Sequence, residues 1–193
     1  MRKHLIWVLA VVALPSVSRA QVPVFEVTPV VSAISFDVEA SVALKGTFHK
    51  WESSFTCPST DASLCVLEIK IQADSVDTGN GMKNGKLKSK DFFDVEQDPY
   101  ITFKSTKIDQ TSPTTFEMNG DFTIRGVTKA EKLNLTLART GTDSGTVTGT
   151  MAFDRKDYGM NKSIPLVKIA NRVEVSVDLK IKRVSGPPLV FKE

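Results

Sequence analysis

Apolar and polar residues alternate along most of this chain with a period of two, the pattern of β-strands that turn one face toward a core. The alternation is clearest at 173–182, where every odd position holds Val, Leu or Ile and every even position is charged or serine. Each such stretch is predicted to form a strand with one apolar and one polar face. Similar alternation occurs at 34–39, 67–72, 101–103, 116–124, 133–137 and 147–153.

Turn residues separate the predicted strands. Gly126 divides two of them, and Thr140–Gly145, with its two glycines, is expected to form a hairpin loop. The pair Asn119-Gly120 instead falls inside a strand, where glycine marks a bulge or a close approach of another segment. Strands joined by short connections predict an antiparallel meander. A sandwich or a closed barrel would bury the apolar faces, and closure would also remove exposed edges.

The segment Met82–Phe93 interrupts this pattern. It mixes four lysines with apolar residues and shows no period of two, so we expect a short helix from about Lys86 to Phe93. The glycine-rich segment Thr78–Gly85 is predicted to be the loop that enters this helix. Its glycine spacing does not match a dinucleotide-binding fingerprint, which excludes the usual phosphate cradle.

The first twenty residues are predicted to be a signal peptide rather than part of the fold. Arg2 and Lys3 precede the apolar run Leu5–Leu14, and Ser18-Arg19-Ala20 places small residues at the two positions that a signal peptidase reads. The alternative, a membrane anchor, needs about 17 or more apolar residues, roughly twice this uncharged run. We therefore expect cleavage after Ala20 and one exported domain over residues 21–193.

Removing the signal peptide changes the charge balance. The chain has 25 Lys and Arg against 22 Asp and Glu, and three of the bases, Arg2, Lys3 and Arg19, lie within residues 1–20. The mature chain would therefore hold 22 bases and 22 acids. Nucleic-acid-binding proteins normally carry an excess of basic residues on one face. The neutral balance argues against a nucleic-acid partner.

Cys57 and Cys65 flank a short polar run between two strand-like segments. A disulfide across this hairpin tip would persist in an oxidising compartment. The competing interpretation is a metal site, but zinc needs about four ligands and the sequence supplies no other Cys or His nearby. The disulfide is the preferred interpretation, and no metal site is predicted.

Residues suited to catalysis are scarce. His49 is the only histidine of the predicted mature chain, and it lies in a strand-like segment rather than in the sharp turn that presents a catalytic serine. The acids of Asp91–Asp98 lack the oxygen spacing of a calcium loop. We therefore expect a protein that is not an enzyme and that uses no catalytic cofactor.

An all-β domain with a continuous apolar face points to ligand binding, because a barrel of about eight strands encloses room for a slender apolar molecule. The same alternation would also arise if the side chains only filled a core, so periodicity alone leaves both possibilities open. The aromatic and sulfur-containing residues that would line such a pocket are Phe36, Phe48, Phe103, Phe116, Met118, Phe122, Met151 and Phe153.

Three segments in order resemble the YceI-like family. The first is 87–94 with its paired Phe, followed by the strand 98–105 of the form Ile-Thr-Phe-x-Ser; the others are 122–129 and 153–160. Two departures are Tyr after Pro99, where the family often has an aromatic residue before the proline, and Tyr158, where Phe is usual. The resemblance covers most of the predicted mature chain.

This resemblance implies a periplasmic, lipocalin-like antiparallel β-barrel of about eight strands that holds isoprenoid-type lipids. The loop around Cys57–Cys65 is not part of the family pattern and would alter the mouth of the cavity. Carried onto this sequence, the lipid-contacting candidates are Phe92, Phe93, Ile101, Phe103, Phe122, Ile124 and Phe153.

Basic residues suggest two further contacts. Arg125 or Arg155 would suit a charged lipid headgroup at the cavity mouth, although either side chain would equally fit a solvent or ion-pair role. The cluster Lys83–Lys90 would fit transient contact with an anionic membrane surface, although such a run is more often a solvated helix face. The oligomeric state is left open, a homodimer included.

The resulting prediction is a periplasmic binding protein that holds a long apolar lipid inside a β-barrel, as a carrier or store. Two alternatives come from other classes. One is an enzyme acting on isoprenoid lipids, and the other is an interaction module whose barrel is filled and binds no ligand.

Overall fold

The computed structural model describes residues 21–28, 31–139, 143–163 and 166–191. The predicted signal peptide, residues 1–20, and positions 140–142 of the predicted loop Thr140–Gly145 lie outside these residues. Within the described part, eleven strands form one antiparallel sheet. They are β1 (Val24–Val27), β2 (Ala33–Ala40), β3 (Leu44–Phe48), β4 (Trp51–Thr56), β5 (Val66–Gln72), β6 (Val76–Asp77), β7 (Tyr100–Gln110), β8 (Thr115–Ile124), β9 (Val127–Arg139), β10 (Ser144–Asp154) and β11 (Ile169–Ser185).

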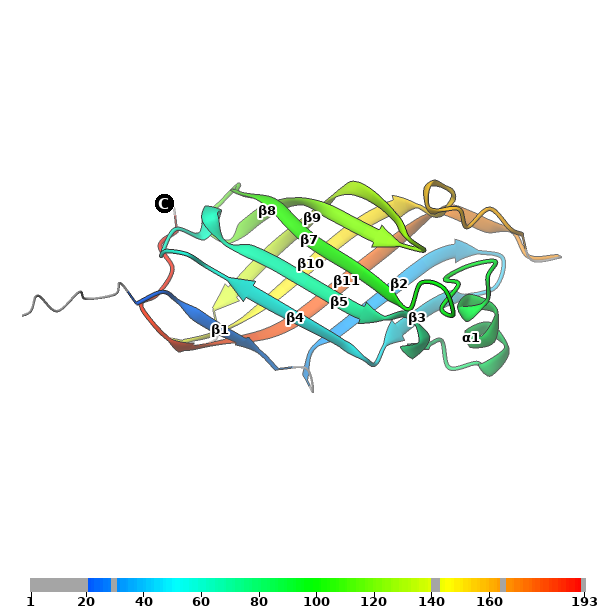
Figure 1. Cartoon of the computed structure of the whole chain (residues 1–193), viewed down its shortest axis with the longest axis horizontal. Coiled ribbons are helices and arrows are strands. Elements are labelled where there is room, and N and C mark those ends of the chain that lie inside the picture. The colour runs from blue at the N-terminus through cyan, green and yellow to red at the C-terminus, as the bar shows by residue number, and fades with distance from the viewer. Residues whose placement is uncertain (1–20, 29–30, 140–142, 164–165, 192–193) are drawn as a thin grey trace, which may run out of the picture.

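The sheet closes into an eight-stranded barrel (Figure 1). From β4 the ring runs through β5, β7, β8, β9, β10 and β11 to β1, which pairs with both β11 and β4. The long β11 also pairs with β2, and β2 pairs with β3. The consecutive strands β1 and β2 therefore lie along the same neighbour, β11, like one interrupted strand. The barrel confirms the predicted fold class and decides against the sandwich.

The two ends of the barrel differ in what covers them (Figure 1). The helix end carries α1 (Gly81–Lys88), the β8–β9 turn and the segment that follows β10. The tail end carries the loop 57–65, the turn 111–114 and the C-terminal tail, 186–191.

The helix α1 lies five residues N-terminal to the expected one, so the predicted bounds of about Lys86 to Phe93 were wrong. Asn80 explains the early start, because its side chain accepts a hydrogen bond from the Lys83 N–H at 3.1 Å and caps the helix. The predicted loop Thr78–Gly85 is thus partly helical. Phe92 and Phe93 fall in the turn after the helix, where both are buried.

Glycine at position 120 allows a close approach inside the barrel, as the sequence predicted. A Cβ atom on Gly120 would lie 2.6 Å from the Lys104 carbonyl oxygen and from the Phe103 ring. The register of β7 against β8 also shifts between Ser105 and Lys107, opposite this glycine. The missing side chain therefore leaves room for the Phe103 ring.

Two further predictions about connections are confirmed. Gly126 does separate two strands, in a two-residue turn where Arg125 and Gly126 have φ of 54° and 67°. Positive φ at both positions matches the twist of a hairpin, although an arginine rarely adopts it. Cys57 and Cys65 form the expected disulfide in the loop between β4 and β5.

Candidate ligand-binding site

The main cavity lies inside the tail end of the barrel and has a volume of about 470 Å³. All eight strands of the ring contribute side chains to its wall, and most of these are apolar. Several are only half-buried, because their free sides face the cavity. Representative wall residues are Phe25 of β1, Phe55 of β4, Phe116 and Met118 of β8, Leu137 of β9, Val147 of β10 and Ile181 of β11.

The C-terminal tail crosses the mouth of this tail-end cavity. After β11 it reaches the disulfide-closed loop, where the Val190 N–H donates to the Thr60 carbonyl oxygen at 2.8 Å. Phe191 then packs edge-on against Phe116, with ring centroids 5.6 Å apart. Because Leu189 and Phe191 also line the cavity, the tail forms part of its wall. The loop that lay outside the family pattern therefore does shape the mouth, as predicted.

The polar groups of the tail-end cavity gather where β10 begins and β11 ends. Asp143, Ser144 and Arg183 are lining residues there. The Arg183 N–H donates to the Asp143 carbonyl oxygen at 2.7 Å, and the guanidinium forms an ion pair with the Asp143 carboxylate. The same guanidinium donates to the Gly186 carbonyl oxygen at the start of the tail. One side of the mouth is therefore polar and cross-linked.

The helix end holds a second cavity of only about 60 Å³. Aromatic rings occupy most of this region. Phe36, Phe48 and Phe93 form one cluster with centroid separations of 5.7–6.5 Å. Phe122, Phe153 and the fully buried Tyr158 form another, at 5.1–5.4 Å. The remaining space is far smaller than the tail-end cavity of about 470 Å³.

A layer of buried side chains lies between the two cavities. On β7, Ile101 lines the helix-end cavity and Ile108 the tail-end cavity, while Phe103 between them lines neither. The same holds for Met151 on β10 and Val177 on β11, which lie between lining residues of the two cavities. The interior is therefore divided, with the Phe103 ring seated over Gly120 in the dividing layer.

The sequence-predicted lipid contacts fall mostly in the helix end. Phe116 and Met118 line the tail-end cavity. Phe103, Met151 and Arg125 line neither of the two cavities. A ligand-binding role for any of them stays a prediction. Those that line the small helix-end cavity are Phe36, Phe48, Phe92, Phe93, Ile101, Phe122, Ile124, Phe153 and Arg155.

Sequence reasoning missed much of the tail-end wall. Leu135, Leu137, Leu179 and Ile181 stood on the apolar side of alternating strands, so periodicity placed them inside without marking them as a site. Phe25 and Phe55 lie in short strands, and the tail residues belong to no strand. In the sequence, the aromatic residues among them stand isolated. Phe25 and Phe191 lie near the two ends of the predicted mature chain, and Phe55 lies beside Cys57.

The two arginines proposed for a headgroup hold loops at the helix end. Arg125 donates to the carbonyl oxygens of Gly159 at 2.6 Å and Lys90 at 3.0 Å. The Arg155 side chain is buried and donates to the carbonyl oxygens of Ala170, Met160 and Lys162. The Arg125 guanidinium thus connects segments far apart in sequence, while Arg155 holds the segment that follows it against the start of β11. Both lie at the end opposite the larger cavity.

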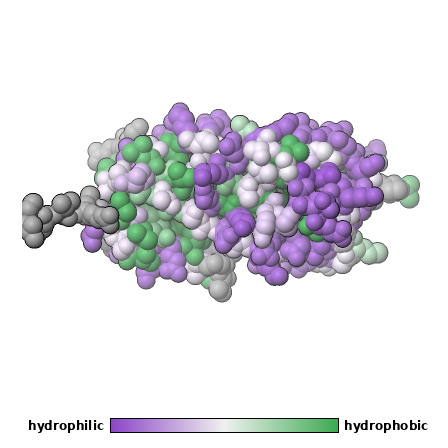
Figure 2. All heavy atoms as spheres, in the orientation of Figure 1, coloured by the Kyte–Doolittle hydropathy of each residue, from purple (hydrophilic) through white to green (hydrophobic). Residues whose placement is uncertain are grey.

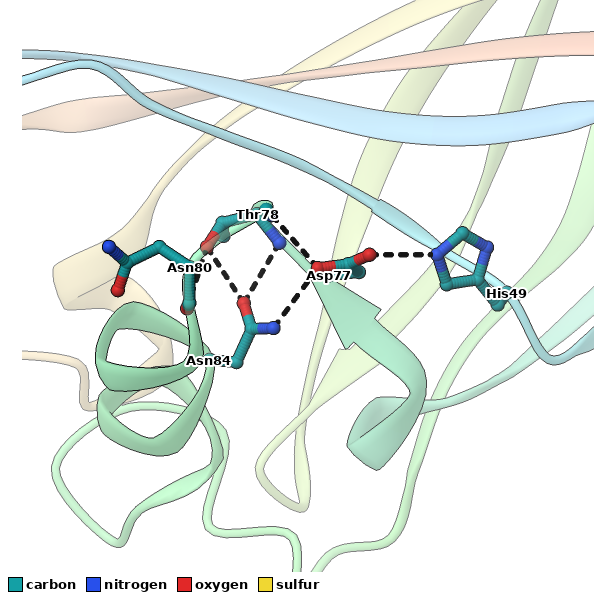
Figure 3. Close-up of polar contacts among 6 residues, drawn as sticks. His49, Asp77, Thr78, Asn80 and Asn84 are labelled. Atoms are coloured by element: carbon teal, nitrogen blue, oxygen red, sulfur yellow. Dashed lines mark hydrogen bonds and ion pairs between the residues drawn. The ribbon is translucent and has the colours of Figure 1, made fainter.

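His49 lies in the two-residue turn between β3 and β4, so its expected place in a strand was wrong. Its exposed side chain belongs to a network that anchors α1 (Figure 3). Its Nε2 is 3.2 Å from Asp77 Oδ2, and Asp77 Oδ1 accepts hydrogen bonds from the Gly79 N–H and the Asn84 side chain. These hydrogen bonds, that from Gly79 first, lower the pKa of Asp77 from 3.8 to about 2. The Asn84 side chain also accepts from Thr78, so the network orders the start of the helix.

On the face shown in Figure 2, apolar residues gather over the tail end and polar residues cover most of the helix end. The helix end still exposes single apolar side chains, among them Met82 of α1 at 84%. The cluster Lys83–Lys90 lies on and after α1, away from the larger cavity. Two of its lysines have partners, since Lys83 donates to the Ala43 carbonyl oxygen and Lys86 pairs with Asp91 at 2.6 Å. Around the tail end, five apolar residues are 40–66% exposed: Val22, Val24, Leu64, Val184 and Val190.

The described residues also bear on other types of site. In that part of the chain, no three His, Cys, Asp or Glu side chains come together as a group that could hold a metal ion. Of the helices described there, none has the length and apolar character needed to cross a membrane.

Comparison with known proteins places the chain in a recognised group. The sequence model of the YceI-like domain matches residues 25–181. A UPF0312 protein of Pseudomonas syringae pv. syringae (strain B728a) is 27% identical over 122 residues, which is 61% of this chain and 64% of the relative, under two thirds of its length. A UPF0312 protein of Vibrio cholerae is 25% identical over 158 residues, 78% of this chain and 84% of the relative.

Solved structures share the fold. BcnA of Burkholderia cenocepacia superimposes with a TM-score of 0.73 at 23% identity, over 80% of this chain and 99% of that one. A polyisoprenoid binding domain from Saccharophagus degradans gives 0.66 at 14% identity, over 83% and 99%. At these identities the match concerns the barrel itself.

Proposed function

Because the chain belongs to the YceI-like domain family, we propose that it holds an isoprenoid-type lipid inside its barrel, as a carrier or store. The observation that carries this proposal is the tail-end cavity of about 470 Å³, with an apolar wall from all eight strands. The description of one structural relative as a polyisoprenoid binding domain supports the ligand class.

The size and chemistry of the cavity suit a lipid chain. Ligand pockets of about 300–1,000 Å³ enclose drug-sized molecules, and this cavity falls in that range. Each methylene buried would contribute about 0.8 kcal/mol before the cost of ordering the chain. A longer lipid would leave its remaining length at the mouth, since the Phe103 layer closes the inner side.

The cavity also bears on the two alternatives, a filled interaction module and an enzyme. An interaction module with a filled barrel would need no open space of this size. An enzyme would need reactive groups beside the bound chain, and the charged groups that line the tail-end cavity in the described residues are Asp143 and Arg183, which pair with each other. We therefore propose binding without turnover.

The proposed location is the periplasm, after cleavage of a signal peptide at residues 1–20. The Cys57–Cys65 disulfide supports this, because such bonds persist in oxidising compartments. The same disulfide closes the loop that receives the C-terminal tail, so an oxidising compartment would also preserve the mouth of the cavity.

Membrane contact, if the lipid is exchanged with a bilayer, is proposed for the tail end rather than for the cluster Lys83–Lys90. The exposed apolar residues Val22, Val24, Leu64, Val184 and Val190 surround the end at which the larger cavity lies. Inserting them would let an apolar chain pass between bilayer and cavity with little exposure to water.

Native mass spectrometry of the protein purified gently from its source tests the proposal. We expect a bound mass of lipid size that organic extraction removes, and re-uptake of an added isoprenoid alcohol. A ligand-free mass together with no uptake of isoprenoid alcohols or quinones would contradict the proposed function.

A further inference from the structure

The tail-end cavity combines an apolar wall with one polar corner at its mouth. The charged residues of the described chain that line it are Asp143 and Arg183, with Ser144 beside them. Because the rest of the wall is largely apolar, the polar end of a bound lipid would lie at this corner, with its chain directed inward.

Arg183 is already occupied on both sides. Its guanidinium contacts the Asp143 carboxylate and the Gly186 carbonyl oxygen, and its side chain is 19% exposed. The Asp143 side chain is about half exposed, so a headgroup that arrives from solvent can reach it. The corner presents hydrogen-bonding groups without a net charge.

We propose that Asp143 sets headgroup specificity, so that the cavity takes isoprenoid lipids with a neutral, hydrogen-bonding headgroup in preference to phosphorylated ones. This inference rests on the proposed function. A phosphate prefers an arginine fork that is free to bind two of its oxygens. Here the fork is held by Asp143, and the carboxylate would repel the phosphate at close range.

A hydroxyl or carbonyl headgroup avoids both penalties. Neither brings a charge into a partly buried site, and a hydroxyl headgroup can donate a hydrogen bond to the Asp143 carboxylate. Headgroup selection then follows from the neutralisation of Arg183 by Asp143. The apolar wall is shared by both lipid classes and does not distinguish them.

Calorimetric titration with farnesol and with farnesyl monophosphate tests this, since the two probes share a C15 chain and differ in the headgroup. We expect the wild-type protein to bind farnesol about tenfold more tightly. In Asp143→Asn the amide can still contact Arg183 but no longer neutralises it. That variant should reduce or invert the preference by about tenfold.

Asp178→Asn is the matched control. It removes one acid from an ion pair with Lys180 on the outer face of β11, away from both cavities. We expect it to keep the wild-type preference, and equal melting temperatures would show that the variants are folded.

The outcomes separate the two proposals. Equal affinity for the two probes, tighter binding of the phosphate by the wild type, or no effect of Asp143→Asn would overturn the headgroup inference. Failure of both probes and of longer isoprenoid alcohols to bind would instead overturn the proposed function.

Discussion

The helix end and the tail end of the barrel interior are walled by strands of the same alternating pattern, yet one is filled and the other hollow. At the helix end, two aromatic clusters leave about 60 Å³. At the tail end, mostly aliphatic side chains stand back around about 470 Å³. Alternation therefore builds the wall, and the size and placement of the inward side chains decide whether the space inside is occupied.

The contrast also explains what the family segments mark. Phe92 and Phe93, Phe122 and Phe153 all belong to those segments, and all line the filled helix end. Arg125 and Arg155 join the loops around them through backbone carbonyl groups. The motifs of this chain thus identify a packed and cross-linked closure, while the hollow end is built from residues without a motif.

Matched Phe→Ala substitutions should separate the two ends most strongly. Each end has an aromatic pair, Phe122–Phe153 at the helix end and Phe25–Phe55 at the tail end. Phe153→Ala should reduce the free energy of unfolding by about 3–5 kcal/mol, because it opens a void in a filled region. Phe25→Ala should cost about 1–2 kcal/mol, since its ring is half-buried beside existing space. Equal losses in urea unfolding would refute the contrast.

The dividing layer offers a second test, of chain length. Phe103→Ala should remove the ring that lies over Gly120 and join the two cavities. We expect affinity for a C30–C45 isoprenoid alcohol to rise about tenfold relative to farnesol, a gain of about 1.4 kcal/mol. Phe25→Ala is the control, because it enlarges the tail end without opening the layer. An unchanged ratio of affinities in Phe103→Ala would show that the layer does not limit the chain.

Loss of the disulfide should lower the stability of the protein modestly and loosen the tail end. The double variant Cys57→Ser, Cys65→Ser removes a short closed loop, for which we expect about 2 kcal/mol lower stability. It should also speed ligand release, because Thr60 in that loop holds the tail through Val190. Stopped-flow displacement of a fluorescent lipid measures the rate. Release as slow as in the wild type would contradict a structural role for the tail at the mouth.

Acid should have a small effect, and at the helix end. The pKa of Asp77 is lowered from 3.8 to about 2, so its network contributes fully above pH 3.8 and is lost as the pH falls from 3.8 toward 2. Asp77→Asn should remove this part of the acid dependence of unfolding and leave farnesol binding unchanged. A difference between variant and wild type that is constant from pH 5 to pH 2 would contradict the assignment.

Much of the fold was predictable, and the location of the cavity was not. Period two placed Leu137 and Ile181 on the inner face, and the cysteine spacing predicted the disulfide. The same alternation also places Phe103, Phe116 and Phe122 on the inner face. These three residues nevertheless lie in the dividing layer, the hollow end and the filled end respectively.

What separates those three residues is their height along the barrel. The position of a residue along the barrel axis depends on strand register around the whole ring and on the bulge opposite Gly120. Neither can be read from one segment of the sequence. The tail was missed for a similar reason, because its contacts with Thr60 and Phe116 are tertiary. The helix was misplaced because its start depends on the Asn80 cap rather than on apolar spacing.

The claim that the tail-end cavity holds the lipid is tested most directly by filling it. Leu137 and Val147 are cross-strand partners on its wall, and Thr136 and Thr148 are the adjacent partners on the outer face. Calorimetric titration with farnesol should show at least a tenfold loss of affinity for Leu137→Trp, Val147→Trp, about 1.4 kcal/mol or more. The outer pair Thr136→Trp, Thr148→Trp should bind as the wild type does. Unchanged binding in the filled variant, with its melting temperature retained, would place the lipid elsewhere.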